Sequence, residues 1–500
     1  MNRIILIAFI FLACISCQES VEKQREEVSP YSDKPNFLFC IADDWSFPHA
    51  GAYGDKTVRT PNFDRLAEEG LLFMNAFTAS PSCAPSRAAI LTGQEMWRLE
   101  EGGLLFGALS DTFPVYTRLL QEQGYGVGFT GKGYAPGDLE RGGWEENPAG
   151  KAYQAIEMDA PEGIRNTDYA GNFAQFLAER DSTQPFCFWY GASEPHRRYE
   201  YGIGEKEGYD LDQVNVPGFL PDTKETRNDV ADYYFEVEWF DKHLGRMIHM
   251  LEDLGELENT FIVVTSDNGM PFPRAKSNLY HYGVHMPLLI HWGKEIEAAR
   301  TIENPVSLSD IAPTFLDLAG VKKPLAMTGK SLAPLLVGEQ KEAPRDFVVT
   351  GLERHTLARP NKKGYPIRAI HTKEYSYIYN FEPGRWPAGD PDFDAWPQGI
   401  FGDIDGGASK SLLLADSLKW REEYLWAMGK RPQEELYNTA IDPYQISNIA
   451  GNPSFQEEQT YLKQLLFKYL EDTGDPRSKG ESPWDEYPYS GGPKEQWMNL

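Results

Sequence analysis

Polar side chains that could bind a metal or an anion follow each of four apolar runs in this 500-residue chain. The runs are NFLFCIA (36–42), GYGVGFTG (124–131), PFCFWYGA (185–192) and TFIVVTS (260–266). The residues that follow them are, in order, Asp43 and Asp44, Lys132, His196, and Asp267 and Asn268. A carboxylate or amide just after a strand is more often a turn residue or a helix cap than a ligand. Four such sets together favour a shared site, and its oxygen ligands favour Ca²⁺ or Mg²⁺ over zinc.

A single cysteine, Cys83, stands in the polar stretch SPSCAPSRAAILTGQ. We expect Pro85 and Ser86 to be the first residues of a helix, which places Cys83 at the positive end of the helix dipole with Arg87 nearby. That setting favours an anion or a thiolate. A thiol nucleophile normally needs a base, however, and a metal site of hard oxygens does not suit sulfur. The surroundings of position 83 therefore favour an oxygen nucleophile, whereas the sequence has the sulfur of a cysteine there.

The elements that must position these residues are indicated by length and periodicity. The four runs are short, apolar and separated by helix-length intervals, which predicts buried parallel strands. Residues 228–255 repeat apolar side chains at three- and four-residue spacing and predict a long amphipathic helix; 287–292 could be another strand, and 307–320 predicts a further helix. This is an α/β pattern with a large, mostly parallel sheet flanked by helices. Ligands of such sheets bind beyond the carboxyl ends of the strands.

The composition changes after about residue 345. Residues 365–383 predict a hairpin, 385–407 are rich in Pro, Gly and Asp and predict ordered loops, and 454–474 predict a terminal helix. We therefore expect an α/β domain at 35–345 and a smaller C-terminal subdomain with an antiparallel sheet at 346–500.

The chain carries a formal net charge of −27, which argues against binding nucleic acid or anionic lipid over a broad face. An anionic substrate would have to be recognised by a local cluster of basic residues or by a metal. Cys40 and Cys187 lie in apolar runs and are expected to act as small hydrophobic residues.

The first residues predict export. Arg3 precedes an apolar run at 4–15 that is too short to span a bilayer and is typical of a secretory signal. Cys17 and a polar tether at 18–34 resemble a bacterial lipoprotein signal, with 1–17 as the leader; the alternative is an ordinary cleaved signal peptide. Either alternative predicts that the protein leaves the cytoplasm of a bacterium, to the periplasm or, if it is lipidated, to the cell surface. Contact with the membrane is expected only through such a lipid anchor.

The stretch CAPSRAAILTG resembles the signature of the type I, formylglycine-dependent sulfatases. The stretches PHR, TSDNGMPFPRAKSNLY and YPIRAI are most similar to heparan N-sulfatase (sulfamidase) and related bacterial carbohydrate sulfatases. The resemblance implies an alkaline-phosphatase-like fold. It also implies that a formylglycine-generating or anaerobic sulfatase-maturating enzyme converts Cys83 to Cα-formylglycine, whose hydrate supplies the missing oxygen nucleophile.

The resemblance implies a role for each matching residue. The implied ligands of one Ca²⁺ ion are Asp43, Asp44, Asp267, Asn268 and the modified Cys83. Arg87 would stabilise the hydrate, Lys132 and Lys276 would hold sulfate oxygens, and His196 would protonate or stabilise the leaving group. One diol oxygen would displace the alcohol or amine of the substrate, and the second hydroxyl would then expel sulfate.

Two departures from the family pattern matter. Lys276 stands where relatives often have arginine. The planar guanidinium group, with its paired N–H donors, is thus replaced by the single ammonium group of lysine. Gly131-Lys132-Gly133-Tyr134 replaces the common G-K-x-H, so the histidine that assists sulfate release is missing and Tyr134 or another histidine would serve. We expect Tyr134, Arg197, Arg354 and His355 to contact substrate, although His355 could equally be an ordinary loop residue.

The expected function is an exported carbohydrate sulfatase that acts on O- or N-sulfate of a sulfated glycan, with ulvan-type algal and heparan-type chains as candidates. One alternative is a phosphodiesterase or phosphonate hydrolase of the same superfamily, since a fold does not fix function. A two-metal site with several histidines would favour that alternative. Another is a glycan-binding lipoprotein without turnover, which would keep Cys83 as a thiol.

Overall fold

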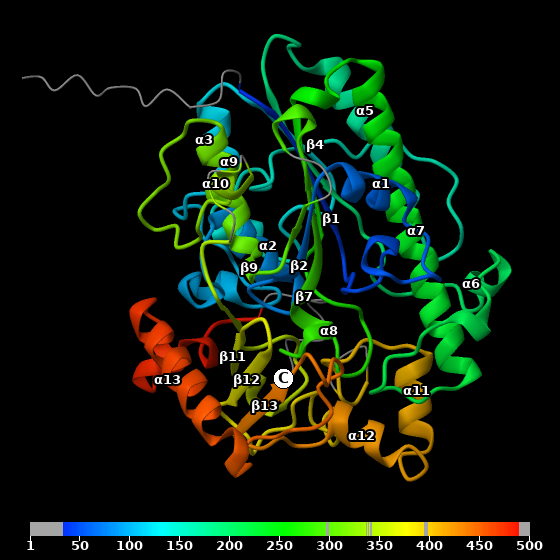
Figure 1. Cartoon of the computed structure of the whole chain (residues 1–500), viewed down its shortest axis with the longest axis vertical. Coiled ribbons are helices and arrows are strands. Elements are labelled where there is room, and N and C mark those ends of the chain that lie inside the picture. The colour runs from blue at the N-terminus through cyan, green and yellow to red at the C-terminus, as the bar shows by residue number, and fades with distance from the viewer. Residues whose placement is uncertain are drawn as a thin grey trace, which may run out of the picture.

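The computed structural model describes residues 34–489, apart from 297–299, 337, 339, 341–342 and 395–398. The predicted leader, and the tether up to residue 33, lie outside the described residues. Two sheets organise the chain (Figure 1): a nine-stranded sheet in the upper part of the view and a four-stranded sheet below it.

The large sheet is mixed and mostly parallel. Its strands run in the order β4-β3-β5-β1-β6-β7-β2-β8, and β9 also pairs with β2. They are β1 (Asn36–Ala42), β2 (Leu71–Phe77), β3 (Gly126–Gly131), β4 (Lys151–Ala152), β5 (Phe186–Gly191), β6 (Thr260–Ser266), β7 (His285–His291), β8 (Arg300–Ile302) and β9 (Val306–Ser307). Among the described strands of this large sheet, only the two pairings of β7, with β6 and with β2, are antiparallel. The sheet therefore brings the carboxyl ends of β1, β3, β5 and β6 to one edge.

Helices cover both faces of this sheet (Figure 1). One face carries α2 (Cys83–Thr92), α3 (Tyr116–Glu122), α9 (Ile311–Leu318) and α10 (Ala333–Leu336). The other carries α1 (Pro61–Glu69), α5 (Tyr169–Glu179) and the 30-residue α7 (Lys224–Asp253). Alternate residues of β1 enter the two cores: Phe37 and Phe39 pack toward α9, and Leu38 and Cys40 pack toward α7. A strand buried on both faces explains the unbroken apolar run.

The small sheet is antiparallel and consists of β10 (Val348–Leu352), β11 (Ile367–His371), β12 (Tyr375–Asn380) and β13 (Glu434–Asn438). Helix α13 (Gln456–Asp472) covers one face, with Leu462 and Leu466 packed near Ile370. Short helices complete the described chain: α4 (Leu139–Gly142), α6 (Ile203–Lys206), α8 (His281–Val284), α11 (Ala408–Ala415) and α12 (Arg421–Met428).

The predicted fold class is confirmed. The first and fourth apolar runs match β1 and β6 exactly, and the predicted hairpin is β11–β12. Several details were wrong or missing, of which two concern the site. Helix α2 begins at Cys83 rather than Pro85, and β2 was not predicted. The division at residue 345 remains a prediction.

Two glycines allow the ends of β3 and β5 to approach closely beside Lys132. Gly131 has a φ of +73°, and a Cβ atom added there would lie 2.0 Å from the carbonyl oxygen of Gly191. A Cβ atom added at Gly191 would lie 2.0 Å from the carbonyl oxygen of Lys132. Backbone rather than side chain would have to move to relieve either clash.

We expect Gly191→Ala to lower the free energy of unfolding by about 1–3 kcal/mol, as overpacking does, and to reduce activity by displacing Lys132. Thermal unfolding and turnover measure the two effects. Gly384→Ala is the matched control, because no atom lies within 4 Å of its added Cβ. Equal melting temperatures for the two variants would contradict this account.

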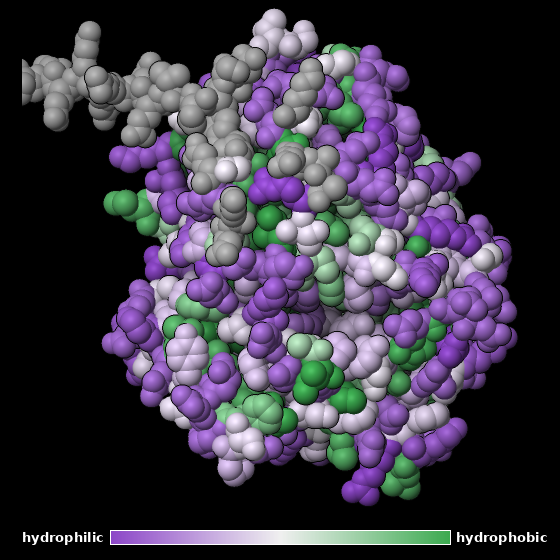
Figure 2. All heavy atoms as spheres, viewed as in Figure 1, coloured by the Kyte–Doolittle hydropathy of each residue, from purple (hydrophilic) through white to green (hydrophobic). Residues whose placement is uncertain are grey.

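One face of the molecule is predominantly polar (Figure 2). The face in Figure 2 is mostly hydrophilic, with scattered hydrophobic residues. Among the described residues, no helix has the length and apolar character needed to cross a bilayer.

Candidate active site

Three buried carboxylates form the centre of the site. The register of β1 and β6 pairs Ala42 with Ser266, so Asp43, Asp44 and Asp267 leave the sheet side by side. Their carboxylate oxygens lie within 4.8 Å of one another. Asn268 donates from Nδ2 to Asp44 Oδ1 at 2.6 Å, and its buried Oδ1 has no hydrogen-bond partner among the described residues. Three carboxylates and one orphaned amide oxygen fit a hard divalent cation such as Ca²⁺.

Each carboxylate also faces a basic side chain. Arg87 Nε lies 2.7 Å from Asp267, Lys132 Nζ lies 2.5 Å from Asp43, and Lys276 Nζ lies 2.8 Å from Asp44. Burial raises the pKa of Asp44 to about 7 and that of Asp267 to about 6, with added repulsion from Asp43.

The pKa of Asp43 shifts in the opposite direction. Burial alone would raise its pKa, but Lys132 and His196 outweigh that effect and lower it. Asp43 is therefore the most firmly ionised of the three carboxylates. The site concentrates charges of both signs out of water, where each interaction is strong.

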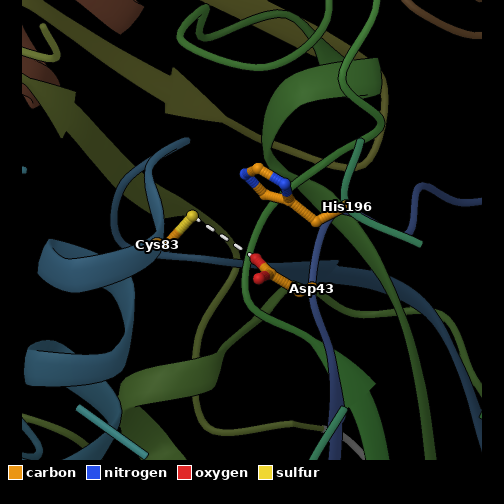
Figure 3. Close-up of side chains that lie close together, drawn as sticks. All are labelled: Asp43, Cys83 and His196. Carbon is orange, nitrogen blue, oxygen red and sulfur yellow. Dashed lines mark hydrogen bonds between the residues drawn. The ribbon is translucent and has the colours of Figure 1, made fainter. Parts of the chain in front are cut away.

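Cys83 is the first residue of α2 and contacts this cluster. Its side chain is buried, and Sγ lies 3.4 Å from Asp43 Oδ1 (Figure 3). Burial, reinforced by the Asp43 carboxylate, raises the pKa of the Cys83 thiol well above its usual value. This corrects the expectation that the helix end favours a thiolate: without modification, this residue is a neutral thiol and a poor nucleophile.

Arg87 follows Cys83 by one turn of α2 and is fully buried. Besides its pair with Asp267, it donates from Nη1 to the Lys132 carbonyl at 2.5 Å. Its Nη2 has no partner among the residues that the structure describes. The guanidinium thus ties α2 to the ends of β3 and β6 and keeps one donor available.

His196 approaches the cluster from the loop after β5 (Figure 3). Its Nδ1 lies 2.7 Å from the Arg197 carbonyl oxygen, which can only accept, so Nδ1 carries the proton of the neutral ring. Its Nε2 lies 3.9 Å from Asp44 Oδ2 and is left to exchange a proton with a ligand. Burial and Lys276 lower the pKa of His196.

A cavity of about 700 Å³ opens above these side chains. It is lined from the large-sheet region by Asp43, Cys83, Lys132 and His196, and from the C-terminal region by His355, Thr356 and Asp405. Five Lys or Arg residues line it, against three acidic residues. The cavity is therefore locally cationic in an acidic chain and suits an anion.

Two of the four residues predicted to contact substrate line the cavity, and two do not. Arg197 and His355 line the cavity. Arg197 is already held by Asp229, at 2.7 and 2.9 Å, and His355 Nδ1 lies 2.8 Å from Ser82 Oγ. Burial lowers the pKa of His355 to about 4, so its ring is neutral near pH 7.

Tyr134 and Arg354 do not line the cavity. The Tyr134 hydroxyl donates to the Gly107 carbonyl at 2.9 Å within the core. Arg354 donates to the carbonyl oxygens of Tyr487 and Pro488. The structure places neither side chain at the cavity. Substrate contact by Tyr134 and Arg354, and replacement of the missing histidine by Tyr134, stay predictions.

Asp405 is one cavity residue that the sequence did not reveal. It lies in the loop before α11, and its Oδ2 is 3.4 Å from Lys276 Nζ. Asp405, Asp44 and His196 also place ligand atoms within 4.8 Å of one another. Lys276 thus lies between two carboxylates from distant parts of the chain. The only sequence signal for Asp405 was its place in an acidic, glycine-rich loop, and such a loop does not by itself indicate a functional site.

Comparison with known proteins agrees with this geometry. The Sulfatase family model matches residues 35–321, and the model of the N-sulphoglucosamine sulphohydrolase C-terminal region matches 274–390. The chain belongs to the sulfatase family and is a sulfuric ester hydrolase. The family match covers the carboxylate cluster, Cys83 and the basic residues around them.

Full-length relatives are moderately similar. An ulvan-active sulfatase of Formosa agariphila is 26% identical, over 96% of this chain and 83% of the relative. The human N-sulphoglucosamine sulphohydrolase is 29% identical, over 88% of this chain and 91% of its own. A solved structure in complex with its substrate D-glucosamine-2-N,6-O-disulfate has a TM-score of 0.62 at 22% identity, covering 91% of this chain and all of that one. This structural likeness supports the alkaline-phosphatase-like fold.

Proposed function

We propose that this chain is an exported carbohydrate sulfatase that removes sulfate, as an ester or as N-sulfate, from a sulfated glycan or its oligosaccharides. The observation that carries the proposal is the contact between Cys83 and Asp43 at the floor of a cationic cavity. A neutral, buried cysteine thiol would be a poor nucleophile at this position. An oxygen nucleophile at the same position would lie beside the carboxylate cluster and face Lys132, Lys276 and His196.

We propose Cα-formylglycine at position 83 and one Ca²⁺ ion as the two additions to the chain. Asp43, Asp44, Asp267 and Asn268 would hold the ion, which would draw electron density from a sulfate oxygen. Formylglycine would supply, as its hydrate, the hydroxyl oxygen that attacks sulfur. Installing it requires a maturating enzyme as a partner.

The chain's own residues perform the remaining work. Lys132 and Lys276 bind sulfate oxygens by charge-assisted hydrogen bonds and hold sulfur above residue 83. Arg87 Nη2 orients the nucleophilic residue. The neutral His196 ring holds its proton at Nδ1, where the Arg197 carbonyl fixes the ring. His196 must therefore take up a second proton at Nε2 before it can protonate the departing oxygen or nitrogen.

The substrate class is supported by the relatives rather than by the cavity alone. The names of the similar proteins include ulvan-active sulfatase, N-sulphoglucosamine sulphohydrolase and N-acetylglucosamine-6-O-sulfatase, all consistent with a sulfated saccharide. Export, with lipidation at Cys17, is proposed from the leader sequence.

Mass spectrometry of the tryptic peptide that ends at Arg87 tests the modification. We expect the mass change from thiol to aldehyde in protein co-expressed with a maturating enzyme. Sulfate release from heparin, ulvan, carrageenan and chondroitin fragments then identifies the substrate. An alkylatable thiol in every preparation would contradict the proposal and favour a non-catalytic glycan-binding protein.

The second candidate function is the hydrolysis of phosphonates or phosphodiesters. A phosphonate monoester hydrolase of Agrobacterium radiobacter has a TM-score of 0.58 with this chain at 18% identity, which shows a shared fold only. Turnover of phosphate esters or phosphonates without turnover of any sulfated sugar would favour it.

A further inference from the structure

The cavity mouth carries two arginines that the sulfatase chemistry does not use. We infer that Arg165 and Arg198 form a second anion-binding subsite, which selects saccharides with another sulfate or a carboxylate near the scissile sulfate. The inference rests on the proposed function and narrows its substrate class to polyanionic sugars.

Both arginines belong to the cavity and come from two loops in contact. Arg165 lies in the loop before α5, and Arg198 follows His196 in the loop after β5. The loops touch at Gly163, where an added Cβ would lie 3.1 Å from the Arg198 carbonyl oxygen and 2.9 Å from the Glu200 nitrogen. The two segments that carry these arginines are therefore in contact beside the cavity that both residues line.

The charge of these arginines is available to a ligand. Both residues are exposed, and neither guanidinium makes a hydrogen bond or an ion pair with any residue that the structure describes. The neighbouring Arg197 differs, because Asp229 holds its guanidinium at 2.7 and 2.9 Å. The Glu194 carboxylate is likewise engaged, accepting from the Arg165 backbone N–H at 3.1 Å and the Tyr169 hydroxyl at 2.8 Å.

The total charge of the chain strengthens the argument. At a net charge of −27, an acidic protein repels a polyanionic sugar at long range. Two exposed guanidinium groups without an ion pair among the described residues oppose that repulsion where the ligand enters, although the Glu194 carboxylate offsets part of the charge of Arg165. Guanidinium binds planar or tetrahedral oxyanions through paired N–H donors, so sulfate and carboxylate are both suitable ligands.

The test compares wild-type protein with the Arg165→Gln/Arg198→Gln double variant on three sugars. They are glucosamine N-sulfate, glucosamine N,6-disulfate, and glucosamine N-sulfate linked to glucuronic acid. We expect the double variant to lose about tenfold in kcat/KM on the substrates with a second anion, mainly through KM, and to change less than twofold on the monosulfate. The two polyanionic sugars distinguish sulfate from carboxylate as the ligand, and added salt should reduce the effect.

Arg421→Gln is the matched control, because Arg421 is exposed at the start of α12 and does not line the cavity. An equal loss on all three sugars, or the same selective loss in the control, would overturn the subsite while leaving the proposed function intact. No sulfate release by the mature wild-type protein from any of these sugars or from the glycan fragments named above would overturn both.

Discussion

We expect Cys83→Ala to abolish sulfate release, with a loss of at least about 10⁴-fold in kcat, because the variant has no side chain that can become the nucleophile. The fold should survive. The side chain is small, and the helix around it is held by Arg87 and by the apolar core. Release of inorganic sulfate by mature protein, measured with a large excess of enzyme, sets the lower limit of detection.

Cys187→Ala is the control for this change. Cys187 is also a buried free cysteine, but it lies within β5 and faces the core. We expect it to retain near-wild-type activity with a small loss of thermal stability. Comparable activity of the Cys83 and Cys187 variants would show that the reaction does not use residue 83.

Asp267→Asn gives the second large effect, because this carboxylate serves two purposes. It belongs to the candidate calcium cluster and pairs with Arg87 at 2.7 Å. Its neutralisation leaves a buried guanidinium without a charge partner, which costs about 3–5 kcal/mol of stability. Removing one anionic ligand also weakens calcium binding by orders of magnitude. We expect activity to fall by about 10²–10³-fold.

The rise in melting temperature on adding Ca²⁺ to chelator-treated protein separates these effects. Wild-type protein should show the rise and Asp267→Asn should not. Asp310→Asn is the control, since Asp310 is a buried carboxylate paired with Arg345 outside the cavity. It should lower stability yet keep the calcium response. A full response in Asp267→Asn would exclude that residue from the metal site.

The strands and the residues at their ends could be predicted because burial on both faces leaves a clear sequence signal. β1 and β6 read as continuous apolar runs, and the parallel arrangement then placed Asp43 next to Asp267. Strand β2 gave no such signal. It follows α1 directly, and its sequence LLFMNAF contains no β-branched residue.

Other features depend on side-chain direction and long-range packing. Pro85 suggested a helix start at its own position, but the first turn of a helix tolerates proline because its N–H groups have no helical partner. Tyr134 stands two residues from Lys132, yet its hydroxyl turns into the core toward Gly107. Asp405 meets Lys276 across 129 residues of sequence, and no local pattern indicates such a contact.

His355 and Asp405 reach the cavity from the C-terminal region, whereas Cys83 and the carboxylate cluster stand at the edge of the large sheet. The reactive centre and one wall of its cavity are thus encoded in different stretches of one gene. Substitutions at His355 or Thr356 would therefore alter the cavity wall without changing a residue of the carboxylate cluster.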